Sequence, residues 1–136
     1  MSQHFADRFG WENLVATGAR VYRSLPPDDR TRAAILTGNY GEAGAVYFFG
    51  PRHGLPRAIS GHNNYWLWGP RQATGELVIA VGVSRGQLAP LFDEVVLADW
   101  VTSDYAMTFE TNLPIYVCRR PKRPLPEVWP TLKRYI

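Results

Sequence analysis

The sequence has a single cysteine, Cys118, and no apolar run of the length that crosses a membrane. One cysteine excludes an internal disulfide and any metal site built from several cysteines. Because Cys118 lies in the apolar run IYVC, we expect a small buried side chain rather than a reactive thiol. A spanning helix needs about 20 apolar residues, and nothing at the N-terminus resembles a signal peptide. The chain as given is therefore predicted to be soluble.

The motifs of common catalytic and cofactor sites are also missing. The three histidines show no metal-ligand spacing, and there is no Gly-x-Ser-x-Gly motif. These patterns predict no metal, no cofactor and no catalytic residue. A glycosidase-like pair of carboxylates, Glu42 with Glu110 or Asp104, stays open because sequence separation does not fix their distance. Whether the chain alone is an enzyme is left undecided.

The composition and the element pattern indicate one α/β domain. With 46% hydrophobic residues, a chain of 136 residues can bury one core over residues 1–136 without a second domain. Apolar residues at three- and four-residue spacing predict a helix over 11–25, which Pro26-Pro27 end. The run LVIAVGV, residues 77–83, is apolar on both faces, as a central parallel strand is. We expect other strands at 33–37, 57–60, 94–98 and 114–119, a polar turn at 28–32, and other helices at 42–49, 65–68, 87–92 and 126–136.

Strands that alternate with helices predict a three-layer α/β sandwich. Its central sheet is expected to be mostly parallel, with about five strands, and to be Rossmann-like or flavodoxin-like. Ligands of such sheets bind beyond the carboxyl ends of the strands. The stretches that follow the strands are therefore the candidate sites.

The stretch GNYGEAG, residues 38–44, follows the first expected strand and raises the possibility of a phosphate loop. It lacks the Gly-Lys-Ser/Thr ending of a P-loop and the G-x-G-x-x-G of a dinucleotide site. Glu42 at the start of the next helix would occupy the position of a phosphate and repel it. The stretch is instead predicted to present Asn39, Tyr40 and Glu42 at the edge of the sheet.

The stretch SGHNNYWLWGP, residues 60–70, combines a histidine and two amides with three large aromatic residues. One interpretation is structural: the tryptophans fill the core and the amides cap a turn. The other is a sugar-binding surface, because amides and aromatic faces suit the recognition of hydroxyl-bearing rings. Its candidate residues are His62, Asn63, Tyr65 and Trp66.

Much of the net charge of +3 lies near the C-terminus, at Arg119, Arg120, Lys122 and Arg123. These side chains form either a solvated basic end or a contact for anionic lipid head groups, near which each basic residue contributes about 1 kcal/mol. Nucleic acid is not an expected partner, since no binding motif accompanies the charge.

The two stretches above, with QHFADRFGW, VYRSLP, GELVIAVG, LPIYVCRRP and LPEVWPTLKRY, carry a resemblance over essentially the whole chain. The sequence resembles the C-terminal soluble region of bacterial family 39 membrane glycosyltransferases, the dolichyl-phosphate-mannose protein mannosyltransferase-like proteins. One departure is YAMTFETN, residues 105–112, where relatives have a proline as in YAMPYEN.

The resemblance implies a parent protein with a long polytopic N-terminal region that uses a polyprenyl-phosphate sugar as donor. The catalytic acidic residues of such proteins lie in a loop between membrane helices, in a region that this chain does not contain. The soluble region lies at the periplasmic face of the inner membrane. The chain is therefore expected to be the excised C-terminus of a longer membrane protein, with the parent's transmembrane region as its partner.

Three hypotheses remain open at this point. The first is a non-catalytic accessory domain that shapes acceptor or donor access to a membrane glycosyltransferase. The second is a stand-alone carbohydrate-binding module, for which a glycan or polyprenyl-phosphate sugar is the ligand. The third is a small independent hydrolase of aryl glycosides or esters that depends on Glu42.

Overall fold

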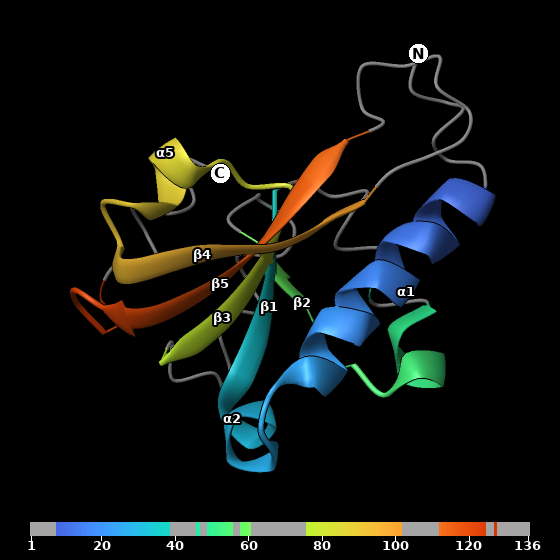
Figure 1. Ribbon diagram of the computed structural model, residues 1–136, viewed down its shortest axis with the longest axis horizontal. Helices are drawn as coiled ribbons and strands as arrows, with labels where there is room; N and C mark the ends of the chain where they lie inside the picture. Colours follow the sequence, from blue (N-terminus) through green and yellow to red (C-terminus); the bar gives the residue numbers. More distant parts are fainter. Residues whose placement is uncertain are drawn as a thin grey trace.

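The computed structural model, shown in Figure 1, describes residues 8–38, 46, 49–55, 58–60, 76–101, 112–124 and 127. Two helices precede the first strand, and a mixed set of strands and short helices follows. In chain order the elements are α1 (Arg8–Ser24), α2 (Pro27–Arg32), β1 (Ala33–Thr37), η2 (Gly50–His53), β2 (Ala58–Ser60), β3 (Leu77–Val81), α5 (Arg85–Leu88), β4 (Phe92–Val101) and β5 (Leu113–Pro121).

Helix α1 confirms the predicted helix and begins three residues earlier, at Arg8. Its apolar stripe is buried, with Leu14, Val15 and Ala19 fully inaccessible. The helix ends at Ser24, whose hydroxyl donates to the carbonyl oxygen of Val21 at 2.6 Å, because the prolines that follow cannot donate backbone hydrogen bonds. Figure 1 shows α1 lying along one side of the sheet.

The five strands form one sheet in the order β2-β1-β3-β5-β4. β2, β1 and β3 are parallel neighbours, whereas β5 is antiparallel to both β3 and β4. The expectation of a mostly parallel, Rossmann-like or flavodoxin-like sandwich is therefore wrong, because two of the four strand pairs are antiparallel. The reason is that an apolar run such as IYVC fits a buried strand of either direction, so the pattern did not encode the direction of β5.

The core lies on both faces of this sheet. Along β3, Leu77, Ile79 and Val81 face the cluster that includes α1, whereas Val78 and Ala80 face the cluster that includes Leu88 of α5. This alternation follows from the two-residue period of a strand. The prediction that this segment is a central strand buried on both faces is confirmed, although its neighbours run parallel on one side only.

Several predicted boundaries need correction. The expected polar turn at 28–32 is helix α2, which starts with a proline and places Asp28 and Asp29 in its first turn, where acidic side chains suit the helix dipole. The expected helix at 87–92 is misplaced, since Ser84 caps α5 through a capping box and β4 already begins at Phe92. The expected helices at 42–49, 65–68 and 126–136 lie outside the described residues, apart from 46, 49 and 127, which are helical.

Candidate functional site at the carboxyl ends of the strands

The carboxyl ends of four strands meet at one edge of the sheet, which we call the carboxyl edge. Thr37 at the end of β1 is paired with Ser60 at the end of β2 and with Val81 at the end of β3. β4 runs in the same direction as β3, since both are antiparallel to β5. β4 therefore also ends at the carboxyl edge, at Val101. Neighbouring strands lie about 4.8 Å apart, so the ends of β2, β1 and β3 form a continuous row, and the start of β5 separates this row from the end of β4.

Both stretches singled out in the sequence leave the sheet at this edge. Asn39 lies two residues beyond Thr37, and His62 lies two residues beyond Ser60. The candidate residues themselves, which are Asn39, Tyr40, Glu42, His62, Asn63, Tyr65 and Trp66, lie outside the described residues. The structure therefore places only the strand ends from which the two stretches start, Thr37 and Ser60. The interpretation of each as a ligand-binding residue stays a prediction.

The described part of the carboxyl edge is held firmly to the sheet. Thr37 is fully buried at the end of β1. Gly82, just after β3, has a left-handed backbone with φ of 73°, which suits glycine, and its N–H donates to the carbonyl oxygen of Pro114 at 2.9 Å. This hydrogen bond ties the loop after β3 to the start of β5, so the row of strand ends is fixed on both sides of β3.

Sequence reasoning missed a polar and aromatic group on β4 next to this edge. Trp100 is 46% exposed, and its backbone N–H donates to the Asp99 carboxylate at 2.7 Å. Asp99 also pairs with Arg20 of α1 at 3.6 Å, between side chains that are both substantially exposed. The predicted strand ended at Ala98, before these residues. The apolar Val101 beyond them was the signal that the strand continues.

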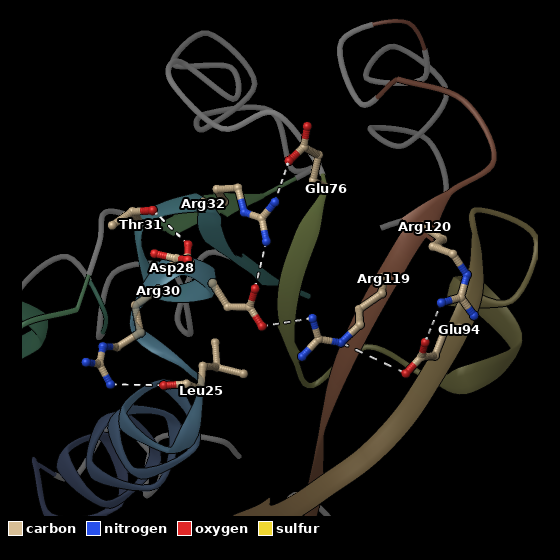
Figure 2. Close-up of polar contacts among 10 residues, drawn as sticks. Leu25, Asp28, Arg30, Thr31, Arg32, Glu76, Glu94, Arg119 and Arg120 are labelled. Carbon is tan, nitrogen blue, oxygen red and sulfur yellow. Dashed lines mark hydrogen bonds and ion pairs between the residues drawn. The ribbon is translucent and has the colours of Figure 1, made fainter.

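The opposite edge of the sheet carries a chain of alternating charges (Figure 2). Arg32 of α2 pairs with Glu76 at 3.4 Å and with Asp29 at 2.7 Å. Asp29 also pairs with Arg119 of β5 at 3.1 Å, and Arg119 approaches Glu94 of β4 at 3.9 Å. The hydrogen bonds from Arg32 and then Arg119 lower the pKa of Asp29, so its carboxylate stays charged at neutral pH. Helix α2 buries none of its residues, and these ion pairs link it to Glu76 and to β5.

The four basic residues predicted to face a membrane lie at this opposite edge, but they are not equivalent. Arg119 is engaged by Asp29 and Glu94, and Arg120 pairs with Glu94 at 2.9 Å. Lys122 and Arg123 are exposed and form no ion pair with any other described residue. Half of the predicted basic charge is thus partnered within the protein. Lipid contact stays a prediction.

Cys118 is fully buried in β5, which confirms the expectation from its apolar surroundings. Burial raises the pKa of its thiol to about 12, so the reactive thiolate is scarce at neutral pH. In the described part of the chain, no three His, Cys, Asp or Glu side chains gather as metal ligands do.

The fold and its edges define a small α/β domain with a mixed sheet and a candidate ligand site at the carboxyl edge. A scan against protein-family models found no match, and neither did searches of curated proteins and of solved structures. The resemblance to family 39 glycosyltransferases therefore stays a prediction. No helix within the described residues has the length and apolar character needed to cross a bilayer.

Proposed function

We propose that the chain is a non-catalytic accessory domain of a membrane glycosyltransferase that uses a polyprenyl-phosphate sugar donor. In this proposal it lies at the periplasmic face and shapes the access of the acceptor. The resemblance over the whole sequence supports the choice of parent protein. The geometry of the carboxyl edge supports the place where a ligand would be held.

One observation carries the proposal: Thr37 and Ser60 are register partners on neighbouring parallel strands. GNYGEAG and SGHNNYWLWGP therefore start side by side, although the two strands are separated by a long stretch of sequence. Together these stretches supply a carboxylate, amides, an imidazole and aromatic rings, which are the groups that bind sugar hydroxyls and stack on sugar rings. In α/β sheets, the stretches that follow neighbouring strand ends are the usual place of a ligand site.

The position of the basic residues 119–123, at the edge opposite the carboxyl edge, favours the acceptor over the donor as the ligand of the carboxyl edge. β5 has nine residues and spans about 26 Å at about 3.3 Å per residue. It starts at the carboxyl edge and ends at the basic residues, so the two regions lie at opposite ends of this strand. If the basic end meets lipid head groups, the carboxyl edge lies well above the membrane surface. A polyprenyl phosphate keeps its phosphate at the head-group level, so an acceptor that approaches from the periplasm is the better fit for this edge.

The first test is the reading frame that precedes this chain. The proposal expects about ten or more upstream apolar segments of spanning length. A native protein that consists of this chain alone would end the proposal.

The second test uses the parent enzyme reconstituted with its donor and acceptor. Glu42→Ala and Trp66→Ala should each raise the acceptor KM about tenfold, which corresponds to about 1.4 kcal/mol of lost binding. Glu127→Ala is the matched control, because Glu127 is an exposed carboxylate outside both stretches. Unchanged KM and kcat in both variants would show that the carboxyl edge does not handle the acceptor.

The same strand-end geometry also favours the second hypothesis, a stand-alone carbohydrate-binding module. The two are separated by titrating the isolated chain with free sugars and polyprenyl-phosphate analogues, followed by NMR. Saturable shifts confined to residues 39–42 and 62–66 without the parent protein favour the module. Binding that requires the parent favours the accessory domain.

A further inference from the structure

The end of β5 and the turn that follows it form a compact basic segment, residues 119–123, which we call the basic turn. The N–H of Lys122 donates to the carbonyl oxygen of Leu91 at 2.8 Å, which fixes the turn beside the start of β4. This hydrogen bond holds the backbone that carries Arg119, Arg120, Lys122 and Arg123 in a defined place.

Arg119 and Arg120 are held in different ways. The Arg119 side chain is 31% exposed and bridges two acidic residues, of which Asp29 is only 15% exposed. The Arg120 side chain is 66% exposed and pairs with Glu94 alone. Shielded, hydrogen-bonded pairs are costly to break, whereas exposed pairs contribute little to stability. Arg119 thus has a structural role, whereas Arg120 can exchange Glu94 for another anionic partner at low cost in free energy.

The backbone of Arg120 gives independent support for a special role. Its φ is 56°, the left-handed region, and it is the only non-glycine residue with positive φ among the described residues. A long side chain in this conformation is disfavoured, and such outliers concentrate at functional positions. The Arg120 guanidinium pairs with Glu94, and the exposed Lys122 and Arg123 follow two and three residues later in the chain.

We propose that Arg120, Lys122 and Arg123 form a contact surface for anionic lipid head groups, and that Glu94 competes with the lipid for Arg120. The membrane setting rests on the proposed function. Attraction of one basic residue to an anionic surface changes affinity about fivefold, which matches or exceeds the strength of an exposed ion pair. An anionic surface can therefore draw Arg120 away from Glu94, while Arg119 remains with Asp29.

Among the described residues, the acidic side chains at this edge are Asp28, Asp29, Glu76, Asp93 and Glu94. Of these, Asp28 and Asp93 are exposed and form no ion pair with other described residues. Asp93 is adjacent to Glu94 on β4 but lies on the other face, since side chains alternate along a strand, so Asp93→Asn removes the same charge without releasing an arginine. It is the matched control for Glu94→Gln.

The experiment measures binding of the 136-residue chain to vesicles of equal parts phosphatidylcholine and phosphatidylglycerol, with pure phosphatidylcholine as reference. We expect binding to the anionic vesicles only, with losses of about fivefold in Lys122→Gln and in Arg123→Gln. Glu94→Gln should raise affinity more than Asp93→Asn. Arg120→Gln should reduce affinity more in the Glu94→Gln background than in the wild type, which measures the competition directly.

Equal effects of Glu94→Gln and Asp93→Asn, with no coupling to Arg120→Gln, would overturn the role of Glu94. Equal binding to neutral vesicles, or tighter binding of duplex DNA with the same variant pattern, would overturn the lipid surface. Circular dichroism of each variant checks that the fold is intact. The acceptor KM of the parent enzyme carrying Glu42→Ala or Trp66→Ala reports on the carboxyl edge, so failure of the lipid surface and failure of the proposed function are separate results.

Discussion

Gly18, in the middle of α1, offers a sharp test of how this helix packs on the sheet. A Cβ atom built at Gly18 meets nothing within 4 Å outside the helix's own backbone, although the residue is buried. Alanine in place of a glycine in a helix interior gains about 0.5–1 kcal/mol, because the unfolded chain loses less backbone freedom. Gly18→Ala should therefore stabilise the protein by that amount.

Differential scanning calorimetry or thermal circular dichroism measures the effect. At about 2.1 cal/mol/K of unfolding entropy per residue, the chain of 136 residues loses about 0.3 kcal/mol of stability per degree near its midpoint. The expected rise in Tm is about 2–3 °C.

The matched control is Gly54→Ala. Gly54 also has nothing within 4 Å of a built Cβ, but its φ is 73°, so alanine there is strained and Tm should fall. A lower Tm in Gly18→Ala would mean that α1 lies too close to its neighbours for a methyl group, and would refute the open space around Gly18.

Two further predictions concern titratable groups. Because the folded protein holds the pKa of Asp29 below its unfolded value of about 3.9, the carboxylate stabilises the fold above that pH, and this contribution is lost as pH falls through the lower, folded pKa. Urea unfolding at a series of pH values should show a smaller loss of stability below about pH 4 in Asp29→Asn than in the wild type; identical curves would contradict the ion pairs with Arg32 and Arg119. Cys118, buried and with a raised pKa, should react with a thiol reagent far more slowly in the native protein than in urea, whereas comparable rates would place it at the surface.

The sequence correctly predicted the elements whose residue pattern is compatible with only one secondary structure and position in the fold. The helical spacing around Leu14 and the prolines after Leu25 are enough to define most of α1. The continuous apolar run 77–81 requires cover on both faces, so β3 had to be central. In these two elements, the apolar residues that the local pattern requires are also the residues that are buried in the fold.

Strand direction and charge partners are properties of the whole fold and have no local pattern. β5 is as apolar as a parallel strand, and only its pairing with β3 and β4 reveals that it runs the other way. Likewise Asp29 and Arg119 are 90 residues apart, so their ion pair was not predictable from spacing. Trp100 was missed because the alternation along β4 shifts at the irregularity between Leu97 and Asp99.

The reversed direction of β5 changes the functional argument and not only the description of the sheet. In a fully parallel sheet, Arg119 to Arg123 would follow a carboxyl end and lie beside GNYGEAG and SGHNNYWLWGP. Cations and sugar-binding groups would then share one site, as recognition of a polyprenyl-phosphate sugar requires. With β5 antiparallel to β3, its carboxyl end lies beside the start of β4, at the opposite edge. The two predicted surfaces are therefore separated by the length of the sheet, so one domain can face lipid with one edge and an acceptor with the other.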